Sequence, residues 1–120
     1  MDELKLGVVE AQFADIIWLN EPLASRELVR LCEEKLKWKK STTYTVLKKL
    51  CDRGIFKNVD GTVSSVISKA EYFSAQSEKI VNDSFGGSLP AFIAAFTSRK
   101  TLTDEEIAQI RSMIESAKEE

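Results

Sequence analysis

Residues 37–54 read KWKKSTTYTVLKKLCDRG, and we expect the rest of the chain to be organised around this stretch. At about 100° per residue, one side of a helix through it gathers Thr43, Val46, Leu47 and Leu50. The opposite side gathers Ser41, Thr45, Lys48 and Asp52, with Tyr44 and Lys49 flanking them. Gly54 then favours a helix end, because glycine tolerates the left-handed conformation that closes many helices.

The outer side of this helix carries groups that suit nucleic acid. A solvent-facing helix tends to alternate Glu and Lys, whereas hydroxyls, an aromatic ring and lysines meet phosphates and base edges. We therefore predict a recognition helix whose DNA contacts come from Lys39, Lys40, Ser41, Thr42, Tyr44, Thr45, Lys48 and Lys49. The lysines would neutralise phosphates, and the other four lie where the N-terminal half of a helix reaches bases. For Tyr44, packing against the preceding helix is the alternative.

The distribution of charge supports this prediction, although the 120-residue chain has a net charge of −2. Residues 26–57 carry ten Lys and Arg residues against four acidic ones, whereas residues 1–25 and 58–120 are both net acidic. The basic block coincides with the predicted recognition helix and the segment before it. This asymmetry is typical of a local electrostatic footprint for nucleic acid. A basic surface without a partner is the alternative.

Composition favours a soluble globular protein, with 43% hydrophobic and 30% charged residues. No apolar run approaches the roughly 20 residues that span a bilayer. The sequence MDELKLGVVEAQF has acidic residues where a signal peptide would be positive, so we expect a cytoplasmic protein with no membrane partner.

The cysteines and the absence of histidine exclude several kinds of site. Cys32 and Cys51 form no Cys-x-x-C pair, and the chain has no histidine. A zinc site or a histidine-based catalytic triad therefore lacks its components. We expect two packed thiols, with no metal, no cofactor and no catalytic residues.

Residues 1–67 predict a winged helix-turn-helix. Apolar residues at helical spacing predict a helix over 8–19, buried through Val9, Phe13, Ile16 and Ile17. A second helix over 25–36 has Ser25 as its N-cap, and the recognition helix follows from about Lys40. Two β-rich runs, 55–59 and 62–67, flank Asp60-Gly61, a dipeptide that favours a two-residue hairpin turn. The chain is thus mainly α, with three helices and a two-stranded hairpin in this domain.

Residues 68–120 predict three further helices, over 69–85, 89–96 and 104–117. Ser68 with Glu71, and Thr103 with Glu106, match capping boxes, and Ser88 is the expected cap before Pro90. The last two helices carry more apolar side chains than a small arm can bury alone: Leu89, Phe92, Ile93, Phe96, Ile107, Ile110, Met113 and Ile114. We expect these eight to form a dimerisation region against a second copy; folding back onto the winged domain is the alternative.

Three blocks of the sequence, in order, resemble the penicillinase-repressor (BlaI/MecI) family. LGVVEAQFADIIW is similar to its opening helix, through Leu6, Glu10, Ile16, Ile17 and Trp18. WKKSTTYTVLKKLCDRG is similar to its recognition helix, through Trp38, Thr42, Thr45, Leu50 and Gly54. FGGSLPAFIAAF and LTDEEIAQIRSMI resemble its C-terminal dimerisation helices. The resemblance implies a homodimeric repressor that binds an inverted-repeat operator in double-stranded DNA.

The sequence also departs from the family pattern. The family's wing is frequently basic and aromatic, whereas residues 60–68 read DGTVSSVIS, so a strong wing contact to phosphate is not implied. The chain ends IESAKEE, without the cysteine-rich motif of the copper-responsive branch. Release in the family looks like cleavage of an Asn-Phe bond, which makes a sensor protease a candidate partner. Here Ala95 precedes Phe96, so we expect dimer separation to be the switch, with proteolytic, small-molecule and partner-driven routes open.

Two other functions compete with DNA binding. A winged-helix protein-interaction module would fit the weak wing and the acidic overall charge, but it gives no reason for hydroxyls and lysines to share one helix face. An enzyme has little support, because the sequence has no histidine, no glycine-rich phosphate loop and no convergent carboxylate pair. Acidic residues gather instead in first turns of helices, where they favour the helix dipole.

Overall fold

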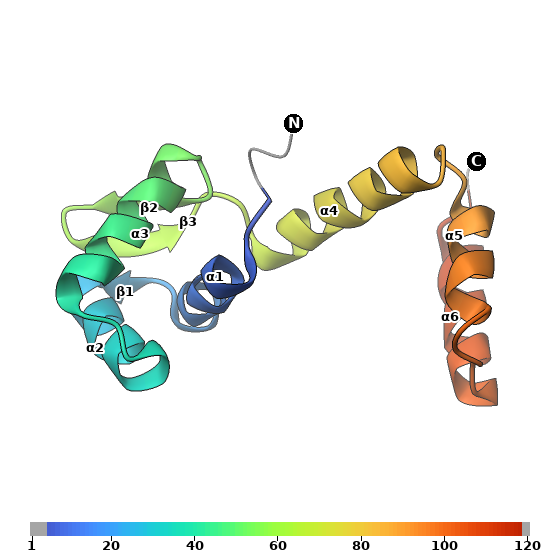
Figure 1. The fold of residues 1–120 in the computed structure, drawn as a ribbon, viewed down its shortest axis with the longest axis horizontal. Helices are drawn as coiled ribbons and strands as arrows, with labels where there is room; N and C mark the ends of the chain where they lie inside the picture. The colour runs from blue at the N-terminus through green and yellow to red at the C-terminus, as the bar shows by residue number, and fades with distance from the viewer. Residues whose placement is uncertain (1–4, 119–120) are drawn as a thin grey trace. The chain divides into compact units, whose positions relative to one another are not determined.

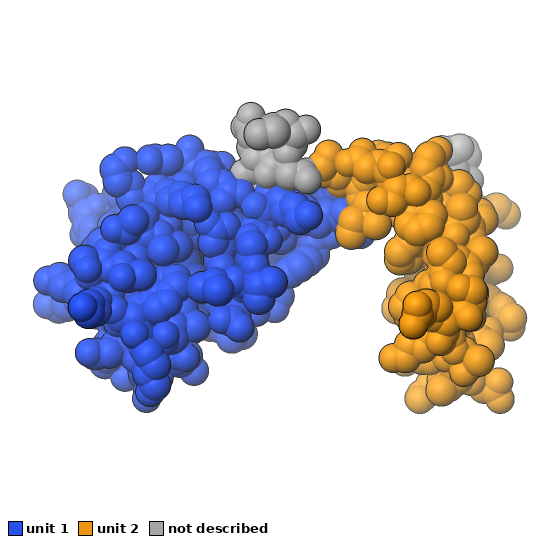
Figure 2. All heavy atoms as spheres, in the orientation of Figure 1, with its two compact units in different colours: residues 1–77 blue, residues 78–120 orange. Residues whose placement is uncertain are grey.

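The computed structural model describes residues 5–118. The start of the first predicted domain (residues 1–4) and the end of the second (residues 119–120) lie outside the described part. Its elements are shown in Figure 1: α1 (Val8–Asn20), β1 (Leu23–Ala24), α2 (Ser25–Leu36), α3 (Lys40–Asp52), β2 (Phe56–Val59), β3 (Thr62–Ser65), α4 (Lys69–Ser84), α5 (Leu89–Thr97) and α6 (Asp104–Ser116). The chain forms two compact units, residues 1–77 and 78–120 (Figure 2). The mainly helical winged-helix fold is confirmed.

The wing is a hairpin of β2 and β3, paired from Phe56↔Ser65 to Val59↔Thr62. Asp60 and Gly61 form its turn with φ of 52° and 82°, the positive values that a type I′ turn requires. The two-residue β1 adds a third antiparallel strand beside β3, giving the order β1-β3-β2. The sequence prediction contained only the hairpin.

Two predicted details of the first helices are wrong. Ser25 is not the N-cap of α2, because β1 keeps the chain extended to Ala24 and the helix begins at Ser25 itself. The Ser25 N–H donates to the Gly61 carbonyl at 2.8 Å, so the hairpin fixes where α2 starts. Val9 is 53% exposed and lies outside the buried face of α1, which consists of Phe13, Ala14, Ile16 and Ile17.

The core of the first unit holds α3 firmly in place. Thr43, Leu47 and Leu50 are buried as predicted, at 0–2% exposure, and Val46 is partly buried. They join a core to which α1, α2, the sheet and the residue before β2 contribute Phe13, Ile17, Leu28, Cys32, Phe56, Val63 and Ile55. At the C-terminal end, the Ile55 N–H bonds to the Leu50 carbonyl and the Gly54 N–H to the Cys51 carbonyl. Gly54 has φ +82°, so α3 closes in a Schellman motif as its glycine predicts.

The start of α4 belongs to the first unit. The predicted capping box is present, since the Ser68 N–H donates to Glu71 and the Glu71 N–H donates to Ser68 Oγ. Tyr72 is buried, and its hydroxyl accepts the Leu6 N–H at 2.8 Å. Trp18 Nε1 donates to the Ile67 carbonyl at 3.1 Å. These bonds tie the segment after the wing to α1 and to Leu6, which precedes it.

The second unit contains the remainder of α4 and the α5–α6 pair. Ser88 caps α5 by accepting the Ala91 N–H at 3.1 Å, with Pro90 in the first turn. Thr103 and Glu106 form a reciprocal capping box at the start of α6. Both caps confirm the predictions from sequence.

Candidate nucleic-acid interface

The outer side of α3 presents hydroxyls and lysines to solvent. Ser41, Thr42, Thr45 and Lys48 are all exposed, while Leu47 and Leu50 anchor the opposite side in the core. A helix fixed along one side and polar along the other has the geometry of an element that enters the major groove. The structure thus gathers these four predicted residues on one free surface.

The N-terminal end of α3 is electropositive. Its N-cap, Lys39, makes no side-chain cap bond, and the first turn contains no acidic residue. By contrast, the first turns of α1, α2, α4 and α6 all contain Glu or Asp. Lys39 and Lys40 are exposed, and neither forms an ion pair with the residues that the structure describes. Free N–H groups, the positive end of the helix dipole and two cations together favour a phosphate.

A groove of about 350 Å³ separates α3 from the wing. It is lined by Tyr44, Leu47, Lys48, Cys51 and Asn58. Tyr44 is half-buried, and its hydroxyl lies 3.2 Å from Ser25 Oγ on α2. This ring therefore forms a wall of the groove and also packs toward α2. Asn58, which the sequence did not single out, brings a polar side chain from β2 to the same groove.

Lys48 and Lys49 have different partners. Lys48 Nζ pairs with Asp52 at 2.9 Å, and both side chains are largely exposed. Lys49 Nζ lies 2.8 Å from Glu10 Oε2 on α1, at the edge of α3 away from the wing groove. Sequence reasoning missed this partner. The available signal was the position of Glu10 in the sequence. Phe13, Ala14 and Ile17 follow it at i+3, i+4 and i+7, so its carboxylate lies on the buried face of α1, where a charge needs partners.

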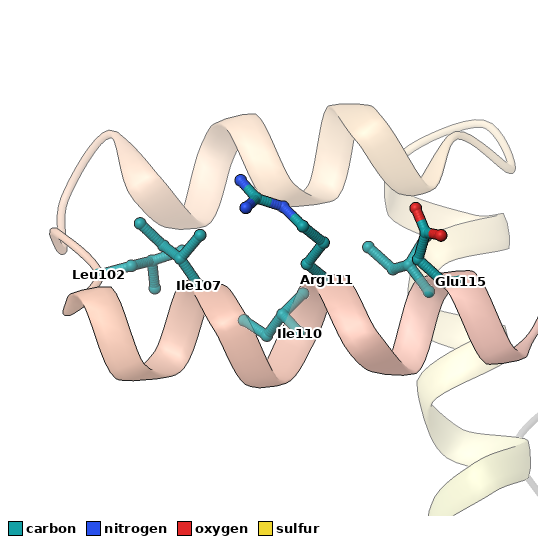
Figure 3. A pocket seen from close by; sticks show the side chains of 6 residues that line it. Leu102, Ile107, Ile110, Arg111 and Glu115 are labelled. Atoms are coloured by element: carbon teal, nitrogen blue, oxygen red, sulfur yellow. The ribbon is translucent and has the colours of Figure 1, made fainter.

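The predicted dimerisation residues form an apolar surface on the second unit. Among the described residues 78–118 none is fully buried, and Leu89, Ile93, Phe96, Ile107, Met113 and Ile114 are 37–66% exposed. A groove of about 280 Å³ between α5 and α6 is lined by Phe92, Ile93, Phe96, Thr97, Leu102, Ile110 and Ile114. Figure 3 shows a second groove along α6, where Arg111 and Glu115 flank the apolar residues. The structure brings the eight residues together on two adjacent helices.

The cysteines are shielded and unpaired. Cys32 is buried and Cys51 half-buried, and burial raises the pKa of both thiols. Within residues 5–118 no group of three or more His, Cys, Asp or Glu side chains could hold a metal ion. No helix in that same range is long and apolar enough to cross a membrane.

Comparison with known proteins identifies the family. The family model described as penicillinase repressor matches residues 6–116. A penicillinase repressor of Bacillus licheniformis is 22% identical over 118 residues, which cover 95% of this chain and 92% of that protein. The matched region extends over both units. Members of this family are transcriptional regulators rather than enzymes. The chain therefore belongs to the penicillinase repressor family of DNA-binding transcriptional repressors.

Proposed function

We propose that the chain acts as a homodimeric repressor that binds an inverted-repeat operator, with α3 of each subunit reading one half-site in the major groove. The observation that carries this proposal is the exposed face of Ser41, Thr45 and Lys48 on a helix whose other side is locked in the core. Among the elements of the first unit, this helix combines an exposed hydroxyl face with an uncapped, basic N-terminal end.

The side chains divide into two roles in this proposal. Lys39, Lys40 and Lys48 position the protein on phosphates, a contribution that is strong and independent of sequence. Ser41, Thr42 and Thr45 reach base edges and specify the site. Tyr44 lies at the rim of the wing groove, where its bond to Ser25 holds the ring beside the reading face. The fourth predicted lysine, Lys49, differs from these three because its Nζ pairs with Glu10 on α1.

A second copy of the chain is the proposed occupant of the α5–α6 surface. Half-exposed Leu, Ile, Phe and Met side chains on adjacent helices are typical of a homodimer interface, and burial against an identical surface removes them from water. Dimerisation also joins two reading helices. The second half-site then binds at high effective concentration, which strengthens operator affinity without any new base contact.

Separation of the dimer is the proposed route of release from DNA. The Ala95–Phe96 bond lies inside α5, within the apolar surface, so a sensor protease could cut it only after this helix opens locally. Cleavage there would detach α6 and leave the reading face intact. Mass spectrometry of the protein after challenging its host with a cell-wall antibiotic tests this route: an intact chain alongside derepressed target genes excludes cleavage.

Fluorescence anisotropy with DNA from upstream of the protein's own gene tests the main proposal. We expect saturable binding of two subunits per site, tighter than to a scrambled duplex, and a footprint of two half-sites with opposite orientation. Equal affinity for both duplexes would contradict sequence-specific repression. No binding to either would favour the alternative of a winged-helix protein-interaction module.

A further inference from the structure

Glu10 forms the centre of a cluster that joins α1 to the C-terminal half of α3. Its Oε2 lies 2.8 Å from Lys49 Nζ, and its Oε1 lies 3.3 Å from Arg53 Nη1. The Gly7 N–H also donates to Oε1, at 3.1 Å. Arg53 in turn donates to the Lys5 carbonyl. One carboxylate therefore binds two cations, Lys49 within α3 and Arg53 at the C-cap of that helix.

This cluster differs from the Lys48–Asp52 ion pair on α3. The Glu10 side chain is only 19% exposed, whereas Asp52, the partner of Lys48, is 64% exposed. An exposed pair contributes little and exchanges readily with solvent ions, but a protected carboxylate with several donors keeps its partners. The Lys49 bond, supported by the Gly7 N–H, holds the pKa of Glu10 below its ordinary value. The carboxylate is thus charged at neutral pH.

Lys49 has a position from which it could otherwise contact DNA. It follows Lys48 directly, flanks the reading face, and its side chain is 60% exposed. A phosphate that approaches Lys49 must compete with the carboxylate and then lies close to its negative charge. Glu10, Lys49 and Arg53 together carry one net positive charge, where the two cations alone would carry two.

We propose that Glu10 withholds Lys49 from the DNA backbone and is therefore a specificity-determining residue. This inference rests on the proposed function. Phosphate contacts strengthen binding to every sequence alike, while Ser41 and Thr45 act on bases. A carboxylate that masks one cation at the edge of α3 lowers non-specific affinity and leaves base reading unchanged. The ratio of specific to non-specific affinity rises as a result.

A four-variant cycle tests the proposal, with anisotropy measured on operator and scrambled duplexes across a salt series. In Glu10→Gln the slope of log K against log salt should steepen by about one per subunit, and non-specific binding near 0.1 M salt should tighten about eightfold per subunit. Lys49→Met alone should leave the slope unchanged, because this lysine is already neutralised. Adding Lys49→Met to Glu10→Gln should restore the wild-type slope. As the matched control, Lys48→Met should reduce the slope by about one per subunit.

The outcomes separate the inference from the proposed function. Two results would overturn the masking role. One is a salt slope in Glu10→Gln equal to that of the wild type, and the other is a reduction of the salt slope in Lys49→Met as large as in Lys48→Met. A purely structural role for Glu10 would weaken binding to both duplexes instead. If the wild type binds neither duplex, the proposed function fails. NMR titration of the Glu10 carboxyl then still tests the pairing: its midpoint should rise in Lys49→Met, and an unchanged midpoint contradicts the cluster.

Discussion

Phe96→Ala should weaken the proposed homodimer strongly, because Phe96 is 48% exposed and lines the apolar groove between α5 and α6. Complete burial of such a side chain is worth roughly 1.5 to 3 kcal/mol, so burying the remaining half contributes about 1 kcal/mol. The substitution occurs twice in a two-fold dimer. The loss is therefore about 2 kcal/mol, which corresponds to a roughly thirtyfold higher dissociation constant.

Sedimentation velocity over a concentration series measures this change. The matched control is Val66→Ala, which shortens an apolar side chain that is 56% exposed in the first unit and should leave the dissociation constant unchanged. Circular dichroism checks that both variants keep their helices. A wild-type protein that stays monomeric at micromolar concentration would refute the reasoning, as would equal dissociation constants for wild type and Phe96→Ala.

Three further predictions concern stability. Thr43→Val should raise the free energy of unfolding in urea by about 1 kcal/mol, because Thr43 Oγ1 is buried without a nitrogen or oxygen partner and only the weakly hydrogen-bonding Cys32 thiol lies against it. A loss of stability would show that the contact with the thiol stabilises the fold. Gly54→Ala should lower it by about 1 kcal/mol, because the residue has φ +82°; no change in the urea midpoint would argue against the tight turn. Glu10 has a pKa below its ordinary value, so its stabilisation is complete above the unfolded-state pKa and is lost as pH falls through the folded-state pKa. Between about pH 5 and about pH 2, the free energy of unfolding of Glu10→Gln should therefore fall less than that of the wild type. Parallel plots of this free energy against pH for the two proteins would contradict the prediction.

Features decided by neighbouring residues could be predicted from the sequence. Capping boxes at Ser68 and Thr103, the Asp60-Gly61 turn and the glycine that ends α3 all depend on contacts within a few residues. The buried side of α3 was likewise readable, because its apolar residues repeat at helical spacing over three turns. These features were sufficient to predict the order of the helices and of the two hairpin strands, and with it the winged helix-turn-helix.

Features decided by distant partners were missed. β1 has only two residues, too short for any period, and exists because Leu23 pairs with Val63 forty residues later. Because of that pairing, Ala24 is the N-cap of α2 and Ser25 is its first helical residue. On α1, the buried face runs through Glu10 rather than Val9, because Lys49 and Arg53 compensate the charge. Local pattern cannot reveal a partner that lies about forty residues away.

Operator affinity of a Ser41→Ala/Thr45→Ala/Lys48→Ala variant tests the central claim most directly. The control variant replaces the same residue types on the second unit, Ser98, Lys100 and Thr101, which are also exposed. Roughly 1 kcal/mol per lost contact predicts about a hundredfold loss of affinity per half-site, with no loss in the control. If the folded triple variant binds its operator as tightly as the wild type, α3 is not the recognition helix.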